Sequence, residues 1–498
     1  MIEGDKKNKN ELLFIEDPQD ELYGKQRKIK ILNLERVEDL CLKKEAQCFV
    51  SFSDNTLESL HVFDSIIKYS RLLKLIGVIY EPVNQPIYCF ASNDEKYIIN
   101  IKICGHYSAW DLPQSVNKII RFADIPDIVI CKFNKIFTPI AVIETTGTAN
   151  VGNSQWQREG RKLGAMITET PLIYQTYYSG TDRSQEPEGG QPREPTSLQV
   201  INHIIYSIRY SCPSFVIYYS NPDVDHRLGF KRSPKEGKYL MGNYLSALML
   251  NSAFGICKEE KAELEKRILI QMKRYLQDTV IKRRKSIIRL DNDLPVLTKK
   301  QRSLLLDEES KFYDFIIKRL NGKNIRIESE FNILDWDYNN FFKWEPGNIE
   351  DKPLIKDLRN SGLNLLSYKK GISKVGICLD TSNLKKIIQD KYNPDRVDIG
   401  RLKENLPTLI FPGRIWKGEG KVESGDPESG ELYAFRELLA LDLEGNKIMN
   451  VLLYIFVVPP DRFRFSEFIK KDTKLTRSFR YNADIVIINN KVQKHDIN

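Results

Sequence analysis

Two apolar runs separated by a short polar turn dominate the first third of the chain. Residues 128–130 (Ile-Val-Ile) and 140–143 (Ile-Ala-Val-Ile) have strand length, and a polar turn lies between them. This pattern predicts an antiparallel β-hairpin. Asp127 precedes the first run and Glu144 follows the second, so the hairpin would bring both carboxylates to one edge of the sheet. Carboxylate oxygens are the hard ligands that Mg2+ prefers.

A helical pattern follows the hairpin, with Asn153 or Ser154 as a suitable N-cap. Its predicted apolar face consists of Trp156, Gly160, Leu163 and Ile167. One polar flank carries Gln155, Glu159 and Lys162, with Arg158 and Arg161 further round. A flank rich in cations and amides suits a phosphate backbone. The alternative to a metal-binding role also stays open, in which Asp127 and Glu144 are ordinary strand-end residues with salt-bridge partners.

The surrounding pattern predicts a mixed α/β core. The expected elements are a helix at 57–76, a hairpin of 87–91 with 97–103, strands at 172–178 and 215–219, and a helix at 197–210. A loop rich in proline and glycine is expected at 180–195.

The second half of the chain begins helical and then returns to an α/β pattern. Helices are predicted at 239–249, 258–290 and 299–320, strands at 375–379, 451–458 and 484–488, and an exposed glycine-rich loop at 413–430. The length of 498 residues exceeds a single core. We expect an α/β protein with a charged arm at 1–30, a mixed-sheet core at 31–235, a helical basic domain at 236–340 and a C-terminal α/β recognition domain at 341–498.

Positive charge is moderately in excess, with a formal net charge of +9. The densest cluster is Lys282, Arg283, Arg284 and Lys285, and the glycine-rich loop adds Arg414, Lys417 and Lys421. Consecutive cations without an intervening acid are what a phosphate clamp would use. A charge run is more often a solvated face, so both interpretations stay open.

Composition excludes several classes of protein. The eight cysteines include no C-x-x-C pair and the five histidines are dispersed, so we expect no zinc site and free thiols in a reducing cytoplasm. No export signal or membrane-spanning run is apparent. The common motifs for phosphate loops, zinc proteases and serine hydrolases are absent.

The arrangement of Pro126-Asp127 and, seventeen positions later, Glu144 resembles the PD-(D/E)XK nuclease superfamily, which includes many type II restriction endonucleases. The resemblance covers roughly residues 55 to 220. It implies a restriction-endonuclease-like core, Mg2+ as cofactor, double-stranded DNA as substrate, and a homodimer. Thr146 stands where the family has a catalytic lysine.

This departure leaves two functional hypotheses. The first is a Mg2+-dependent site-specific endonuclease in which Asp127 and Glu144 hold the metal and Lys162 replaces the motif lysine as third catalytic residue. Gln155, Arg158 and Arg161 would then contact DNA. The second hypothesis is a DNA-binding protein with an inactive nuclease-like core, in which Thr146 marks the loss of the site.

Overall fold

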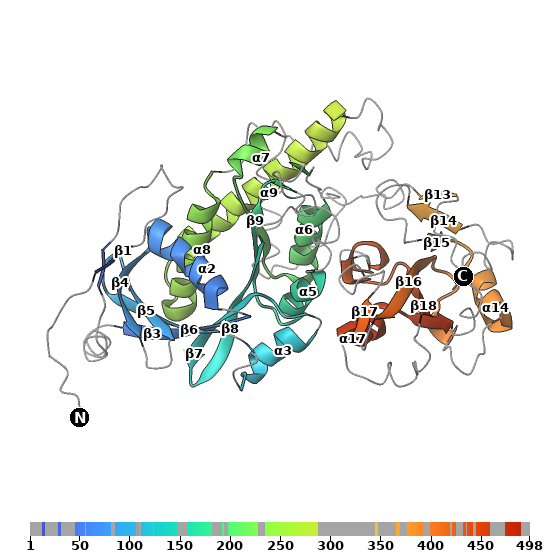
Figure 1. Ribbon diagram of the computed structural model, residues 1–498, viewed down its shortest axis with the longest axis horizontal. Helices are drawn as coiled ribbons and strands as arrows, with labels where there is room; N and C mark the ends of the chain where they lie inside the picture. The colour runs from blue at the N-terminus through green and yellow to red at the C-terminus, as the bar shows by residue number, and fades with distance from the viewer. Residues whose placement is uncertain are drawn as a thin grey trace.

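The computed structural model describes most of the chain outside 287–375 and the two termini. The described residues are 45–54, 56–80, 85–105, 107, 111–122, 124–146, 158–181, 192–193, 198–227, 235–286, 376–391, 399–418, 421–424, 432–434, 436–441, 445–458 and 474–489, with short strands at 12–14, 28–30, 344–346 and 365–368. They form two α/β units, which lie side by side in Figure 1.

The first unit is built on a mixed sheet of eight strands in the order β12-β9-β8-β7-β3-β6-β5-β4. Neighbours are parallel in the pairs β12/β9, β9/β8 and β3/β6 and antiparallel elsewhere. The strands are β3 (Glu45–Ser53), β4 (Leu73–Tyr80), β5 (Pro86–Ser92), β6 (Tyr97–Cys104), β7 (Ile128–Asn134), β8 (Ile136–Thr146), β9 (Leu172–Tyr177) and β12 (Ser214–Tyr219).

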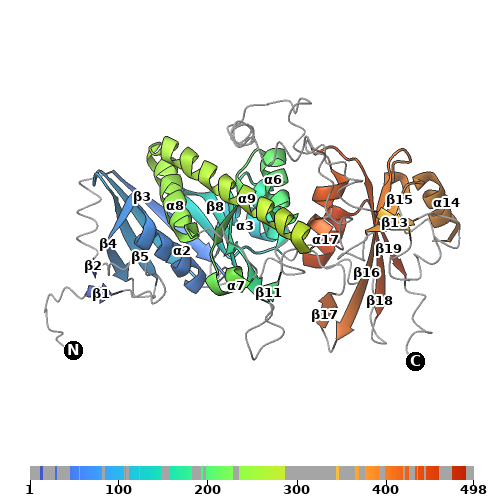
Figure 2. The same cartoon turned by 90° about the horizontal axis from the view of Figure 1, so that it is seen from above.

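Helices cover both faces of this sheet (Figures 1 and 2). They are α2 (Thr56–Tyr69), α3 (Gln114–Phe122), α5 (Glu159–Ile167), α6 (Leu198–Tyr210), α7 (Pro222–Arg227), α8 (Gly237–Phe254) and α9 (Lys258–Ser286). Alternate residues of β7 point to opposite faces of the sheet. Ile128 and Ile130 pack with α2 and α8, whereas Val129 and Cys131 pack with α3 and α5 on the other face. Asp127 shares its parity with Val129 and therefore lies on the α3/α5 side.

The helices α8 and α9 share one hydrophobic core with the eight-stranded sheet. Leu240, Leu245, Ile268 and Tyr275 belong to the same buried cluster as the strands. Gly242 allows α8 to approach α2 closely, since a side-chain carbon there would overlap the carbonyl group of Ser65. The described part of the predicted helical domain thus packs directly on the first unit, and the domain boundaries themselves stay predictions.

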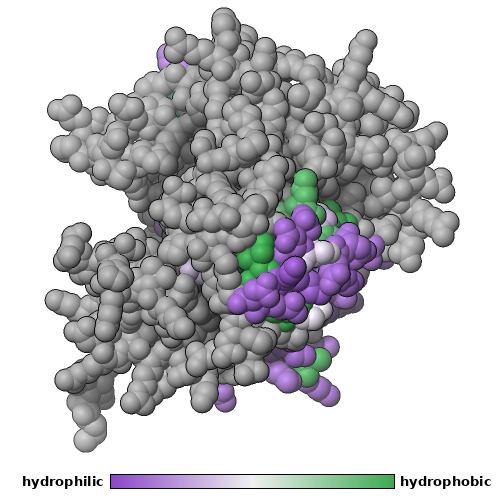
Figure 3. Space-filling model, turned by 90° about the vertical axis from the view of Figure 1, so that its right-hand side faces the viewer, coloured by the Kyte–Doolittle hydropathy of each residue, from purple (hydrophilic) through white to green (hydrophobic). Residues whose placement is uncertain are grey.

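The C-terminal unit is built on a second sheet with the order β13-β14-β15-β16-β18-β19, in which β17 extends β16 as a hairpin. Its strands are β13 (Trp344–Pro346), β14 (Leu365–Tyr368), β15 (Gly376–Cys378), β16 (Thr408–Gly418), β17 (Lys421–Ser424), β18 (Asn450–Val458) and β19 (Ile485–Asn489). Its helices include α14 (Thr381–Lys391), η6 (Arg436–Ala440) and α17 (Lys474–Asn482). The outer side of this unit, where α14 lies, is mainly hydrophilic among the described residues (Figure 3).

The α/β class and most predicted elements are confirmed. The hairpins β5/β6 and β7/β8, the strands β9, β12, β15, β18 and β19, and the helices α6, α8 and α9 agree with the sequence pattern. Strand β3 and helix α3 were not predicted. In the arm at 1–30, β1 (Leu12–Phe14) pairs with β2 (Lys28–Lys30). The predicted helix at 299–320 lies outside the described residues.

Three predictions of local structure were wrong. The helix expected to reach residue 76 ends at Tyr69, because the Ser70 hydroxyl accepts the next free N–H groups, those of Leu72 and Leu73. The helix expected from Asn153 or Ser154 begins at Glu159. The loop expected at 413–430 is largely a hairpin, since 413–418 belong to β16 and 421–424 to β17.

The loop predicted at 180–195 also has paired ends, because β10 (Gly180–Thr181) and β11 (Pro192–Arg193) form a short antiparallel pair. Among the helices that the structure describes, none has the length and hydropathy needed to cross a lipid bilayer.

Candidate active site

The β7/β8 hairpin brings Asp127 and Glu144 together, as predicted. Ile128 pairs with Ile143, so the next residues outward are the two acids. The backbone N–H of Asp127 donates a 3.3 Å hydrogen bond to Glu144 Oε2. Both residues are buried, with 8% and 2% of their surface exposed. Glu144 shares parity with Val142, which packs on the α3/α5 side, so both carboxylates occupy that face of the sheet.

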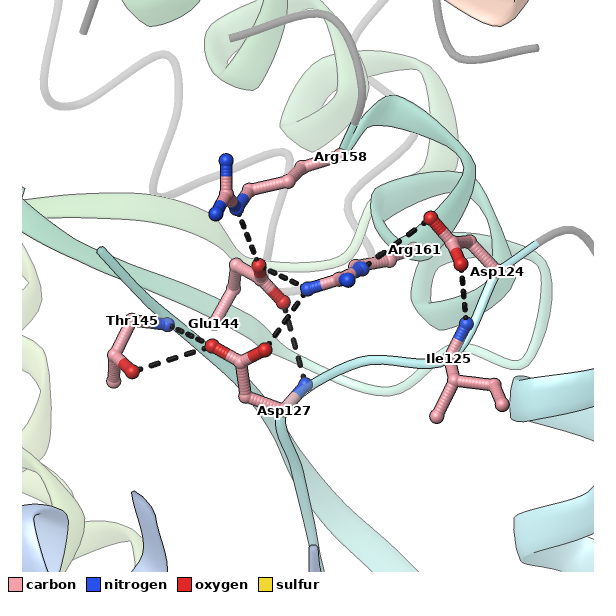
Figure 4. Close-up of polar contacts among 7 residues, drawn as sticks. All are labelled: Asp124, Ile125, Asp127, Glu144, Thr145, Arg158 and Arg161. Carbon is pink, nitrogen blue, oxygen red and sulfur yellow. Dashed lines mark hydrogen bonds and ion pairs between the residues drawn. The ribbon is translucent and has the colours of Figure 1, made fainter. Parts of the chain in front are cut away.

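Thr145 fixes the orientation of the Asp127 carboxylate. Its backbone N–H donates a 2.8 Å hydrogen bond to Asp127 Oδ2, and its hydroxyl group donates a second of 3.2 Å to the same oxygen. Oδ1 is left facing the Glu144 side chain and helix α5 (Figure 4).

Two arginines of the α5 segment point at the acid pair (Figure 4). The Arg161 Nη1 atom lies 2.9 Å from Asp127 Oδ1 and also contacts Glu144 Oε1, while its Nε atom lies 3.3 Å from Asp124 Oδ2. Arg158 Nε lies 2.7 Å from Glu144 Oε1. Because one nitrogen contacts both acids, their nearest oxygens are within about 6 Å, twice a hydrogen-bond length.

In this structure the two arginines of the flank predicted to face phosphates contact carboxylates. The side chains of Arg158 and Arg161 are only 26% and 23% exposed and contact carboxylates of the same chain. Both remain predicted DNA contacts. Ile167, expected on the apolar face, is 40% exposed, whereas Gly160 and Leu163 are buried as predicted.

Burial controls the proton affinity of the site. Desolvation raises the pKa of Glu144 to about 7, although Arg161 opposes the shift and Asp127 adds to it. Burial lowers the pKa of Arg161, but Glu144, Asp124 and Asp127 outweigh this and raise it above its ordinary value. Arg161 therefore carries a permanent positive charge between the acids.

Lys162 faces the opposite flank of α5 and is buried. Its Nζ atom lies 2.7 Å from Glu159 Oε1 and 5.3 Å from the centre of the Tyr206 ring. Asn202 of α6 donates a hydrogen bond to the other oxygen of Glu159. Burial lowers the pKa of Lys162 and raises that of Glu159, and in each case the partner opposes the shift.

A narrow pocket connects this buried pair with the acid site. Its lining consists of Glu144, Arg158, Glu159, Arg161, Lys162, Leu172, Tyr174 and His203. The structure thus brings Lys162 into one pocket with Glu144, as its predicted catalytic role requires, although its ammonium group contacts Glu159.

The sequence analysis did not predict several residues around the site, among them Asp124, Thr145, His203 and Tyr107. His203 Nδ1 lies 2.9 Å from Ser214 Oγ, and the His203 ring stacks on Tyr174. Burial, and secondarily Lys162, holds the pKa of His203 well below its ordinary value, so the imidazole is neutral. The hydroxyl group of Tyr107 is buried without a hydrogen-bond partner among the described residues.

The charges of the acid pair also affect the pKa of Tyr107. Burial, followed by the charges of Asp127 and Glu144, raises the pKa of Tyr107 well above its ordinary value. The phenol is therefore neutral and keeps its proton for donation. No periodic pattern surrounds it in the sequence, which is why only the fold reveals it.

The remaining predicted DNA contacts are placed only by their backbone. Gln155 lies outside the described residues. Lys282, Arg283, Arg284 and Lys285 occupy the C-terminal end of α9, Arg414 and Lys417 belong to β16, and Lys421 begins β17. Their side chains lie outside the described part of the structure.

The donor set fits Mg2+, which is commonly held by one or two carboxylates with water and substrate phosphate completing the shell. Asp127 and Glu144 provide two such carboxylates, and a cationic nitrogen already lies between them. Within the described residues, no group of three or more histidine, cysteine, aspartate or glutamate side chains is arranged around a potential metal position.

Comparison with known proteins assigns no family, because no protein-family model, no curated protein and no solved structure matches the chain.

Proposed function

We propose that the chain is a Mg2+-dependent endonuclease that hydrolyses DNA phosphodiester bonds, as a site-specific enzyme of the type II restriction kind. The observation that carries the proposal is the convergence of two buried carboxylates, from adjacent strands, on one cationic nitrogen. Two carboxylates that together bind a guanidinium group have the negative charge to bind Mg2+ in its place, once Arg161 turns to another partner such as a phosphate.

The order of elements supports a restriction-endonuclease-like core. After the first strand of the sheet, β3, the order is helix α2, strands β4 to β6, helix α3, the acidic hairpin β7/β8, and then α5, β9, α6 and β12. This is the order that the resemblance to the PD-(D/E)XK superfamily implies.

In this proposal Asp127 and Glu144 hold the metal, which when bound supplies charge neutralisation and an acidified water. Thr145 keeps the Asp127 carboxylate oriented. Arg158 and Arg161 have planar guanidinium groups that match a phosphate as well as a carboxylate, so they can change partner when the substrate binds. Lys162 remains the predicted third catalytic residue.

A second candidate function is DNA binding by an inactive nuclease-like core. The observation that favours it is the pair Arg161 and Arg158, whose ion pairs with Asp127 and Glu144 already supply two positive charges to the two acids. Thr146 at the position of the motif lysine agrees with this alternative.

The deciding experiment incubates plasmid or phage DNA with the protein in Mg2+ and in EDTA, and compares Asp127→Asn and Glu144→Gln with the parent. We expect discrete fragments only in Mg2+ and no cleavage by either variant, with DNA binding retained. Asp64→Asn, which alters an acid paired with Lys68 on α2, is the matched control and should cut normally. DNA binding without cleavage by the parent would select the second function.

A further inference from the structure

Four neighbouring strands have the same order and directions in the two units, although α14 lies between β15 and β16 where β7 and β8 form a tight hairpin. In the first unit β7 is antiparallel to β8, which is followed by two parallel neighbours, β9 and β12. In the C-terminal unit β15 is antiparallel to β16, which is followed by two parallel neighbours, β18 and β19. Helices α5 and α6 precede the parallel strands of the first unit, and η6 and α17 precede those of the second.

Sequence signals occur at matching places in both units. Arg158-Glu159 stands at the start of α5 and Arg436-Glu437 at the start of η6. Each glutamate precedes the next strand by thirteen residues, from 159 to 172 and from 437 to 450.

The second signal is a Ser-x-Arg-Tyr sequence in the last helix. It occupies residues 207–210 at the end of α6 and residues 478–481 in α17. Each tyrosine precedes the last strand by four residues, from 210 to 214 and from 481 to 485. Two matching signals at matching spacings, on the same order of four strands, are what a duplicated unit would retain.

The second copy lacks the chemistry of the first. Strands β15, with the sequence Gly-Ile-Cys, and β16, with Thr-Leu-Ile-Phe-Pro-Gly-Arg-Ile-Trp-Lys-Gly, contain no acid. Lys162 lies three residues after Glu159, whereas Ala440 lies three residues after Glu437. The second copy therefore has neither the two strand carboxylates that would bind a metal nor the lysine at the corresponding position.

The two units meet through α6 of the first and η6 of the second. Arg209 of α6 donates to the Glu437 carboxylate and, at 2.7 Å, to the Glu437 carbonyl oxygen, and Tyr210 donates to the same carboxylate at 3.2 Å. The side chains of Arg209 and Glu437 are 3% and 0% exposed. Such a fully buried pair belongs to a fixed interface rather than a passing contact.

The two equivalent tyrosines, Tyr210 and Tyr481, share a hydrogen bond across this interface, and the Tyr481 ring centre lies 4.4 Å from the guanidinium carbon of Arg436, which pairs with Glu437. Contact between equivalent residues is what a twofold axis produces in a symmetric dimer. In Figures 1 and 2, α17 lies on the side of the C-terminal unit that faces the first unit.

We propose that the chain is a pseudo-dimer within one polypeptide, in which the C-terminal copy holds the substrate nucleic acid without cutting it and the Asp127–Glu144 site cuts one strand. This proposal rests on the proposed nuclease function and replaces the homodimer expected from the sequence. The hairpin β16/β17 carries Arg414, Lys417 and Lys421, the charges that a phosphate-binding copy needs.

The first test uses supercoiled plasmid with Mg2+ and follows nicked and linear products over time. We expect nicked circles to accumulate, with a rate proportional to protein concentration and with the protein sedimenting as a single chain. Linear product formed without a nicked intermediate, at a rate that rises with the square of the protein concentration, would overturn the proposal.

Absence of any cleavage would remove the nuclease function alone, so a second test addresses the pseudo-dimer directly. The variant combines Tyr210→Cys and Tyr481→Cys in a background where Cys41, Cys48 and Cys257 are serine. A thiol-reactive linker of about 10 Å is then added. This length suits two side chains that meet tip to tip. We expect a link within one chain, identified by mass spectrometry of the joined peptides. The two single-cysteine variants are the controls and should give none. A folded double variant that links only between chains, or not at all, contradicts the proposal.

Discussion

Glu144 shows how burial in a carboxylate pair changes the behaviour of one residue. Its pKa of about 7, raised by desolvation, means that the folded protein takes up a proton there that the unfolded chain has already lost. The stabilising contribution of this group is complete below the ordinary pKa of 4.5 and is lost as pH rises through 7. Metal binding needs the carboxylate form, so cleavage should rise over the same interval.

Replacing Glu144 with glutamine should remove this pH dependence. Between pH 4.5 and pH 7 the free energy of unfolding of the parent should fall by up to about 3 kcal/mol relative to Glu144→Gln, as a shift of about 2.5 pKa units implies. Denaturant unfolding of both proteins at several pH values measures it. Parallel pH profiles for the two proteins would show that burial does not shift this group.

Individual site residues differ in how far the sequence foretold them. Asp127 and Glu144 follow from the hairpin pattern, because a local turn brings strand ends together. Arg161 does not, since its direction depends on where α5 begins, and the helix starts at Glu159 rather than at the predicted N-cap. Tyr107 and His203 depend on packing between distant segments, which no local pattern encodes.

At the scale of elements, helix α5 carries a different ion-pair cluster on each of two flanks. Arg158 and Arg161 face the acid pair, whereas Glu159 and Lys162, also three residues apart, face α6. Each pair shares a flank because residues three apart lie on one side of a helix.

Lys162→Met should lower the free energy of unfolding by about 3–5 kcal/mol, because Glu159 would stay buried without its cation. The double variant Lys162→Met, Glu159→Gln should recover most of this stability. We expect cleavage to stay lost in the folded double variant, whereas Lys135→Met, in the exposed hairpin turn, should cut normally. Single-turnover rates decide the matter, and a double variant as fast as the parent would leave Lys162 with a structural role alone.

The contact between α2 and α8 depends on the absence of a side chain at Gly242. Gly242→Ala should gain about 1 kcal/mol of helix propensity, but overlap with the Ser65 carbonyl group should cost more, as overpacking does. We expect net destabilisation of about 1–3 kcal/mol, measured by thermal or denaturant unfolding. Ser252→Ala, in the same helix, is the control and should change stability little. A Gly242→Ala protein as stable as the parent would show that the helices can separate without cost.

Elements with local signals were the ones predicted correctly. Strand β3 was missed although it lies at the centre of the sheet, because its partners β6 and β7 are about 50 and 80 residues away. Leu75 fitted a continued helix equally well, but its pairing with Phe90 of β5 places it in a strand. Short apolar runs are ambiguous by periodicity, and long-range pairing resolves them.

At the scale of the whole molecule, the excess positive charge bears on the proposed nucleic-acid partner. The cluster at 282–285 lies at the C-terminal end of α9. Four consecutive cations without an intervening acid are what a phosphate contact would use.

Replacing Lys282, Arg283, Arg284 and Lys285 with alanine should weaken binding to all DNA sequences alike. The slope of log binding constant against log salt should decrease by up to about one unit for each phosphate group that the protein no longer neutralises. Binding measured at several salt concentrations tests this. Replacing the neighbouring acid Asp278 and its neighbour Gln277 with alanine is the control, and an unchanged slope in the cluster variant would identify the cluster as a solvated face.

The guanidinium group of Arg161 between Asp127 and Glu144 also affects how the newly made chain reaches its native state. Two buried like charges would otherwise oppose closure of the hairpin onto α5, because each loses water and repels the other. Arg161 supplies the opposite charge from within the same chain, at 2.9 Å from Asp127. A chain leaving the ribosome therefore carries within its own sequence a counter-ion for this part of its sheet.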